Sequence, residues 1–109
     1  MTPRLEKLES QIESVKREVL KLGPMRPGSI SKQYRRPAEK KHPFYQISYT
    51  HRMRSRSEYV RKEHLRALRL ETAEFKRFKK WVEALVALSL RASKMRVERL
   101  KEARPGGRS

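Results

Sequence analysis

The sequence predicts an α+β fold: an N-terminal helix, a three-stranded antiparallel meander, and a long C-terminal helix that pairs with the first helix. Two changes in hydrophobic period support this prediction. Apolar residues recur every three or four positions before residue 23 and again after residue 62, but they alternate with polar residues in between. A third observation is the turn-forming pair Gly23-Pro24, which separates the first helix from the strands.

The first helix is predicted over residues 3–22. Pro3 suits its first turn, and Gly23-Pro24 ends it. Its apolar residues follow one another in steps of three and four, as in the seam of a coiled coil. They are Leu5, Leu8, Ile12, Val15, Val19 and Leu22. Because an isolated helix of this length is marginal, we expect the seam to bind a partner helix, in the same chain or in a second subunit.

Three short strands are predicted near residues 29–35, 44–50 and 54–60, and a tight turn around Arg52 joins the last two. Tyr45, Ile47 and Tyr49 would share one face of the second strand, since side chains alternate along a strand. We expect these three side chains to pack in the core. The alternative is that the aromatic rings are exposed among basic residues and stack on unpaired bases.

A single long helix is predicted over residues 62–104, because no glycine or proline interrupts this stretch. Its apolar stripe runs from Leu65 to Ala92 and includes Val86. This stripe is longer than the first helix can cover, which favours a homodimer or another helical protein partner. We expect residues 1–104 to form one small domain and residues 105–109 to form a flexible tail.

Composition limits the classes of function. The chain of 109 residues carries a formal net charge of +17, which favours polyanionic partners. It has no cysteine and three histidines, and it lacks a nucleophile–base pair and a glycine-rich phosphate loop. We therefore expect no enzymatic activity, no metal site, no cofactor and no small-molecule substrate. No apolar stretch is long enough to span a membrane, and we expect a soluble, cytoplasmic protein.

The positive charge is concentrated in the predicted sheet. Residues 26–66 hold twelve basic and three acidic residues, whereas residues 1–25 hold five and four. Basic side chains spaced along strands and turns can neutralise successive phosphates of DNA or RNA, with low sequence selectivity. The candidate nucleic-acid-binding residues are Arg35, Arg36, Lys40, Lys41, Arg52, Arg54 and Arg56.

Two other interpretations of the charge stay open. The basic residues could form a solubilising shell, which is a common role of surface charge. Alternatively, the chain could be a protein-interaction or assembly module in which the seam of the first helix and the long helix bind a partner, without nucleic acid.

The segments GPMRPGSISKQYRR and HPFYQISYTHRMRSRSEYVRKEHL resemble a family of small uncharacterised bacterial and archaeal proteins, a domain of unknown function. The similarity covers about residues 22–90 and implies architecture more than activity. That family has a cysteine-rich segment where this chain has Pro37-Ala38-Glu39-Lys40-Lys41. A metal or redox role of those cysteines does not carry over, although His42 matches a histidine of the family's pattern.

Overall fold

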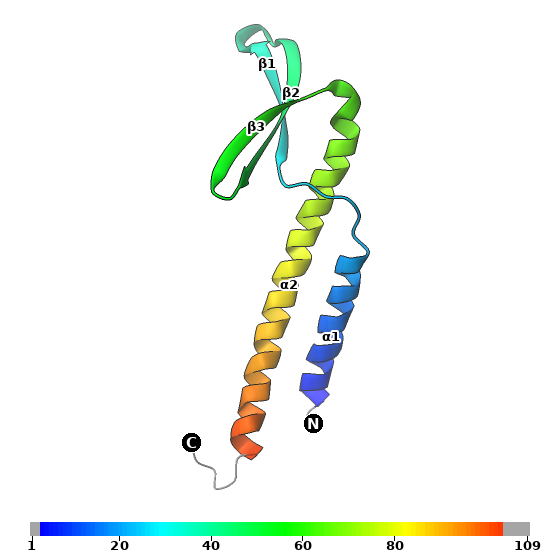
Figure 1. Ribbon diagram of the computed structural model, residues 1–109, viewed down its shortest axis with the longest axis vertical. Coiled ribbons are helices and arrows are strands. Elements are labelled where there is room, and N and C mark those ends of the chain that lie inside the picture. Colours follow the sequence, from blue (N-terminus) through cyan, green and yellow to red (C-terminus); the bar gives the residue numbers. More distant parts are fainter. Residues whose placement is uncertain (1–2, 104–109) are drawn as a thin grey trace. The chain divides into compact units, whose positions relative to one another are not determined.

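The computed structural model describes residues 3–103 and confirms the predicted fold class. Helix α1 (Pro3–Leu20) precedes a three-stranded antiparallel sheet in the order β1-β2-β3, and the long helix α2 (Leu65–Ala103) follows the sheet and packs against α1 (Figure 1). Residue 104 and the predicted tail, residues 105–109, lie outside the described residues. The chain divides into a helical unit, residues 3–21 with 78–103, and a sheet unit, residues 22–77.

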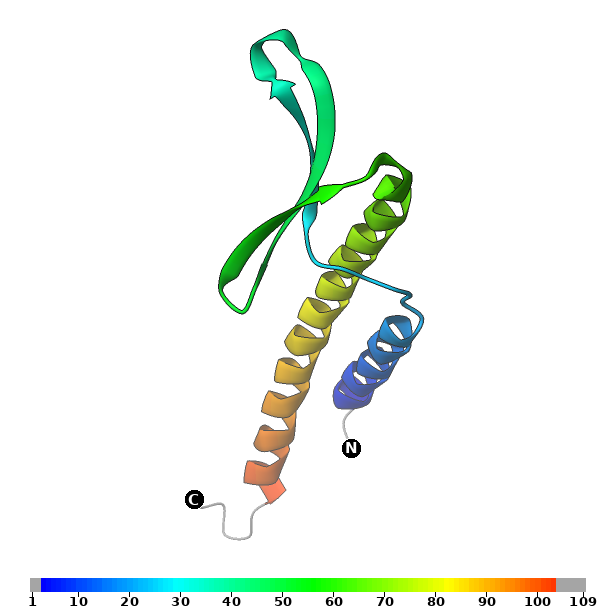
Figure 2. The ribbon, with the colours of Figure 1, turned by 45° about the horizontal axis from the view of Figure 1, so that its top comes forward.

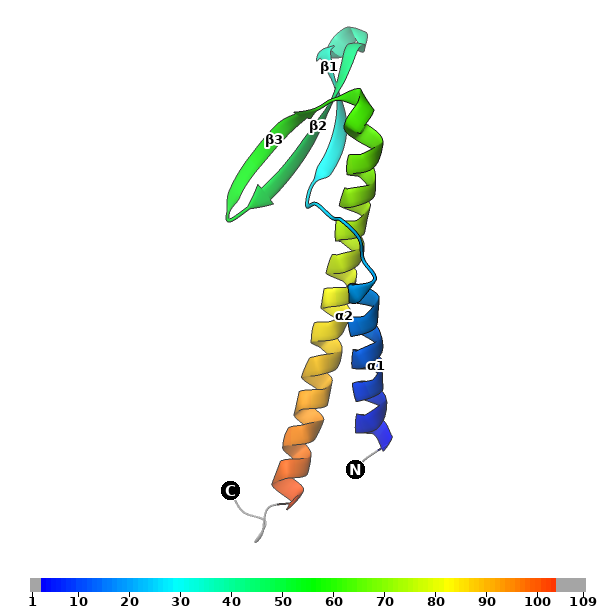
Figure 3. The same cartoon turned by 45° about the vertical axis from the view of Figure 1, so that its right-hand side comes forward.

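The helical unit is built on the predicted seam. Figure 3 shows α1 lying beside the C-terminal part of α2. Leu5, Leu8 and Ile12 of α1 are buried together with Ala92 of α2, and three partly buried side chains of α2 pack against this cluster. These three side chains are Leu85, Leu88 and Met95. The partner helix of the seam is therefore α2 of the same chain.

The helix boundaries differ slightly from the predicted ones. α1 ends at Leu20 because the Lys21 amide bonds to the carbonyl of Glu18 (3.2 Å), an i→i−3 bond that tightens the last turn. Leu22 therefore lies in the connection after the helix. Before α2, residues Lys62–His64 form a short 3₁₀ turn, and the α-helix begins at Leu65.

Val86 belongs to the apolar stripe predicted for the long helix, but it does not pack on α1. This side chain is 61% exposed, whereas Leu88, two residues later, packs on the core of the helical unit. Successive residues of an α-helix point about 100° apart. Since α1 covers only the face of α2 that carries Leu85, Leu88 and Ala92, Val86 points away from it.

The sheet consists of β1 (Ser29–Arg36), β2 (Lys41–His51) and β3 (Arg54–Val60). β2 begins three residues earlier than predicted. A 3₁₀ turn, Pro37–Glu39, precedes Lys40, which adopts a left-handed conformation (φ 52°) and turns the chain back so that Lys41 pairs with Arg36. Sequence periodicity does not reveal such a turn, because lysine rarely adopts positive φ.

The turn between β2 and β3 lies where the sequence predicts it. His51 pairs with Arg54, and Arg52 and Met53 between them both have positive φ, as two-residue hairpin turns of the favoured twist require. Two hydroxyl pairs join the strands: Ser48 with Ser57 at 2.9 Å, and Thr50 with Ser55 at 3.0 Å. These pairs support a single register for the hairpin.

Residues 22–28, the connection between α1 and β1, are hydrogen-bonded to the first turns of α2 within the sheet unit. The Arg26 amide donates to the carbonyl of Glu71 (3.1 Å), and the Gly23 amide donates to the carboxylate of Glu74 (2.8 Å). The connection ends at Gly28 (φ 141°), where an added Cβ would lie 2.9 Å from the Cγ1 atom of Ile47. Ile47 is 1% exposed, so Gly28 allows the connection to close over the small core of this unit.

Candidate nucleic-acid interface

The sheet separates the candidate basic residues into two groups at its opposite ends (Figure 2). The connection cluster lies where β1 turns into β2, and the hairpin cluster lies where β2 turns into β3. The eleven residues of β2 separate the two ends by roughly 30 Å, at about 3.3 Å per residue. This distance exceeds the Debye length of about 8 Å at physiological ionic strength, so the clusters form two independent basic surfaces.

The connection cluster comprises Arg35, Arg36, Lys40 and Lys41, all of which are exposed. The carboxylate of Glu39 lies among them, 3.7 Å from a guanidinium nitrogen of Arg36 and 3.9 Å from the Lys41 ammonium. The guanidinium of Arg35 lies over the ring of Phe44, 5.6 Å from its centre. The positive charge of this cluster is therefore partly neutralised by Glu39 of the same chain.

The hairpin cluster comprises Arg52, Arg54 and Arg56. Every side chain from His51 to Tyr59 is exposed, so both faces of this part of β3 meet solvent. Within residues 3–103, none of the three arginines forms a salt bridge. Arg54 and Arg56 point to the same face of β3 because they are two residues apart. The hairpin therefore presents guanidinium groups that the described chain does not neutralise by direct pairing.

The single acid of β3, Glu58, is held by other partners. One of its carboxylate oxygens accepts a hydrogen bond from Arg26 (2.7 Å), and the other accepts one from the hydroxyl of Tyr49 (2.7 Å). The hydrogen bond from Tyr49 and then that from Arg26 lower the pKa of Glu58, while the bond to Glu58 raises the pKa of Tyr49. Arg26 also lies over the Tyr49 ring, 5.2 Å from its centre. Glu58 thus forms its hydrogen bonds with Arg26 and Tyr49, and its interaction with Arg56 of the hairpin cluster is electrostatic only.

Basic residues of the chain itself lie over one face of most aromatic rings of the sheet. Ile47 is buried, as predicted, but Tyr45 and Tyr49 on the same face are only half-buried. A basic group lies over each of four rings, at 5.2–5.9 Å from the centre: Arg26 over Tyr49, Lys32 over Tyr34, Arg35 over Phe44, and Arg69 over Tyr45. Only one face of each ring remains for other contacts. Tyr59, by contrast, is 64% exposed.

The seam of α1 does not offer a surface to a second protein. Leu5, Leu8, Ile12 and Val15 are buried in the helical unit. Val19, near the end of the helix, is half-buried. An assembly role through this seam would require the chain's own helix pair to open.

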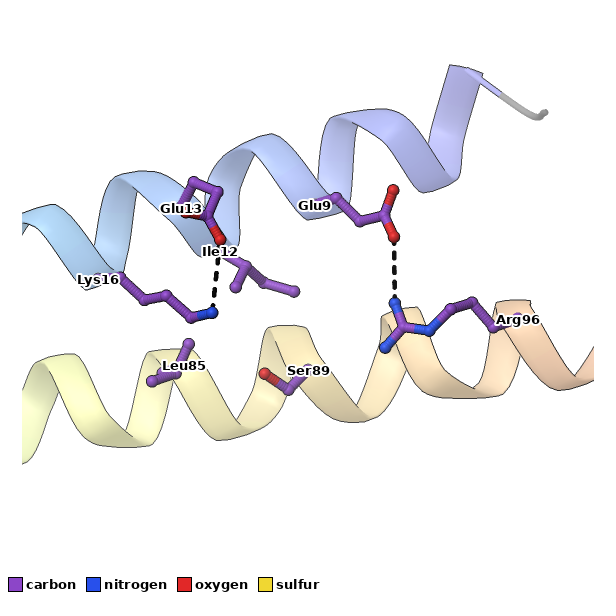
Figure 4. A pocket seen from close by; sticks show the side chains of 7 residues that line it. All are labelled: Glu9, Ile12, Glu13, Lys16, Leu85, Ser89 and Arg96. Atoms are coloured by element: carbon purple, nitrogen blue, oxygen red, sulfur yellow. Dashed lines mark hydrogen bonds and ion pairs between the residues drawn. The ribbon is translucent and has the colours of Figure 1, made fainter.

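A shallow groove runs between α1 and α2 in the helical unit (Figure 4). Arg96 reaches across it to Glu9 (3.3 Å), and Lys16 pairs with Glu13 on α1 (3.4 Å). Both acids in the groove are therefore neutralised by bases. The pair of Arg96 with Glu9 links the two helices. Either carboxylate could take part in acid–base chemistry only after its ion pair has broken.

Two absences hold for the part of the chain that the structure describes. Residues 3–103 contain no group of three or more histidine or acidic side chains arranged to hold a metal ion. None of the helices in that range combines the length and the apolar character needed to cross a membrane.

Comparisons with known proteins give no assignment: no protein-family model matches the chain, and neither does a curated protein or a solved structure. The resemblance to the family of uncharacterised prokaryotic proteins therefore stays a prediction. The function has to be inferred from the geometry of this chain.

Proposed function

We propose that this protein binds nucleic acid through phosphate contacts made by the hairpin cluster, with the connection cluster as a second, weaker contact surface. The exposure of the hairpin carries the proposal. From His51 to Tyr59 every side chain is exposed, and among residues 3–103 the three arginines of this stretch form no salt bridge. A guanidinium is a planar fork that matches phosphate oxygens in bidentate geometry.

A solubilising shell explains these features less well. Shell charges are effective anywhere on a surface, and interspersed charges of both signs serve that role. In β3 the one acid, Glu58, forms its hydrogen bonds with Arg26 and Tyr49, and Arg56 acts on it only through space. The hairpin therefore groups positive charges together and does not intersperse them with negative charges.

The occupied aromatic rings favour duplex over single-stranded nucleic acid. Proteins that bind single strands offer aromatic faces on which bases stack. Here Tyr34, Phe44, Tyr45 and Tyr49 each have a basic group over one face, which leaves Tyr59 as the exposed ring of the sheet. The proposed contacts are therefore with the duplex backbone and carry little sequence selectivity. We also propose that the protein acts in the cytoplasm.

The proposal is tested by fluorescence anisotropy with labelled duplex DNA, single-stranded DNA and RNA over a range of salt concentrations. Replacing Arg52, Arg54 and Arg56 with glutamine should lower the slope of log affinity against log salt by about 3 for duplex DNA, since each lost phosphate contact contributes about 0.9. A matched control replaces Lys76, Lys79 and Lys80 of α2 with glutamine. It removes the same charge from another surface and should change the slope by less than about 1.

Equal losses in the two triple variants would show that net charge alone attracts the nucleic acid, and would overturn the proposal. Unchanged binding in the hairpin variant would overturn it as well. A further variant with glutamine at Arg35, Arg36, Lys40 and Lys41 measures the second surface. Because the clusters are far apart, its effect should add to that of the hairpin variant.

A further inference from the structure

Helix α2 carries a second stripe of mainly aliphatic residues that the fold does not use. Its members follow one another in steps of four and three residues, which places them on one narrow face of the helix. They are Val86, Leu90, Ser93, Val97 and Leu100, here called the outer stripe. The four aliphatic side chains are 61%, 56%, 46% and 71% exposed in that order. Exposed aliphatic residues repeated at this spacing typify a packing surface, whereas scattered ones need no explanation.

The middle position of the outer stripe is polar. Ser93 is exposed and has the smallest side chain of the five members. Paired helices tolerate a single polar residue in an apolar seam, at a cost in stability. The aliphatic pairs on either side, Val86 with Leu90 and Val97 with Leu100, therefore supply the apolar contact area of the stripe.

The outer stripe is distinct from the face that packs on α1. Leu85 and Ala92 face α1, and the stripe residues Val86 and Ser93 each follow one position later, about 100° around the helix. With Leu88 and Met95 included, the face toward α1 is centred about 140° around the helix from the outer stripe. The C-terminal end of the outer stripe is hollowed into a shallow depression lined by Val97, Leu100, Lys101 and Ala103.

Charged residues at the edges of the stripe are predominantly basic. At about 100° per residue, Lys94 and Lys101 flank one side and Arg96 flanks the other. Lys101 also pairs with Glu98 (3.6 Å), and Arg96 also pairs with Glu9. Lys79 and the acidic Glu83 lie before its N-terminal end. In paired helices, residues that flank an apolar seam select partners of opposite charge.

We propose that the outer stripe docks an amphipathic helix of another protein whose apolar seam is flanked by aspartate and glutamate. The spacing of the stripe supplies the apolar half of such an interface. The edge lysines and Arg96 supply the charge that selects an acidic partner. This inference does not depend on nucleic-acid binding, which uses residues of the sheet unit.

Two other occupants fit the stripe less well. A second copy of the chain would bring two predominantly basic stripe edges together, and each copy carries a net charge of +17. A membrane surface is usually met by a broad apolar face with aromatic anchors. The outer stripe is narrow, contains no aromatic residue and is interrupted by Ser93.

The test uses the full chain and three designed peptides. The acidic peptide has four heptads with leucine at the two seam positions and glutamate at the flanking positions, where glutamates oppose pairing of the peptide with itself. A second peptide has lysine at the flanking positions, and a third is a scrambled form of the acidic peptide. Binding is followed by fluorescence anisotropy near physiological salt, and circular dichroism checks that each protein variant is folded.

The acidic peptide should bind, and the lysine and scrambled peptides should bind at least about tenfold more weakly. The variant Leu90→Asp should weaken binding of the acidic peptide by about tenfold or more. Arg91→Asn is its control, because it makes the same change in net charge one residue away from the stripe. It should change the affinity less than about twofold.

Three outcomes would overturn the proposal. Equal binding of the acidic and scrambled peptides would mean that charge alone attracts them. Sedimentation showing a dimer that Leu90→Asp dissociates would identify a second copy as the occupant. Cosedimentation with phosphatidylserine-containing vesicles that Leu90→Asp abolishes, without peptide binding, would identify a membrane surface.

Discussion

The helical unit and the sheet unit use their side chains in different ways. The helical unit buries Leu5, Leu8, Ile12 and Ala92 in one aliphatic cluster, and many of its charges pair along the helices. The sheet unit buries Ile47, Val60 and Thr72, and it leaves β3 exposed on both faces up to Tyr59. The helical unit thus has an aliphatic core between two helices. The sheet unit buries few side chains, and those of the hairpin from His51 to Tyr59 all meet solvent.

The largest effect on stability is expected from Leu5→Ala in the helical unit. Leu5 is 1% exposed, and truncating a buried leucine to alanine typically lowers the free energy of unfolding by about 2–5 kcal/mol. Urea denaturation followed by circular dichroism measures this loss. The control is Tyr59→Ala in β3, which should change the free energy of unfolding by less than about 0.5 kcal/mol.

Hydrogen exchange in the Leu5→Ala variant sharpens the comparison. If the units open separately, amides of α2 after Phe78 should exchange faster, while those of β2 keep their protection. Equal acceleration in both would show that the chain unfolds as one cooperative body. The two units would then differ in composition but would not unfold independently of each other.

A smaller loss is expected from Gly28→Ala in the sheet unit. The added methyl group would lie 2.9 Å from Ile47 and 3.2 Å from the carbonyl oxygen of Ser48, at a positive φ that alanine rarely adopts. We expect the free energy of unfolding to fall by about 1–3 kcal/mol. Gly23→Ala is the matched control, because its Cβ would meet only the Glu74 carboxylate at 3.7 Å. Equal stabilities of the two variants in thermal unfolding would contradict the described path of the connection.

The smallest effect concerns Glu58 and appears only in acid. Since the folded state lowers the pKa of Glu58 below its ordinary value of 4.5, this group stabilises the fold above that pH, and the contribution is lost as the pH falls through the lowered pKa. Between neutral pH and pH 3, the melting temperature of the native protein should therefore fall more than that of Glu58→Gln. Tyr49→Phe removes the largest cause of the shift and should behave in between. Parallel curves for the native protein and Glu58→Gln would rule out the role of this carboxylate.

Much of the fold was predictable because its signals are local. The heptad spacing of α1, the turn at Arg52 and Met53, and the absence of helix breakers after Lys62 each depend on neighbouring residues. What the sequence does not reveal depends on contacts between elements or on an unusual backbone conformation. Val86 belongs to the periodic stripe of α2, but only the position of α1 determines which side of that stripe is covered. Likewise, the early start of β2 depends on a positive φ at Lys40.

The sequence predicts which basic residues form the candidate site, but it does not predict how they are arranged in space. The sequence shows a local excess of basic residues, yet only the meander reveals that Arg36 and Arg54 lie at opposite ends of β2. The contact between Tyr49 and Glu58 follows from the hairpin register once the turn at Arg52 and Met53 is known. The contact of Arg26 with Glu58 does not, since it depends on the path of an irregular segment.

The tip of the hairpin holds Arg52 and Met53 at φ 52° and 65°. Asparagine and glycine adopt this conformation more readily, so these two residues are a poor choice for making a turn. Met53 is also 98% exposed, so it gains nothing from burial. If the hairpin binds nucleic acid as proposed, contacts made by Arg52 would offset this cost at the solvent-facing tip. The tip would then be a place where selection for contact outweighs selection for rapid and stable folding.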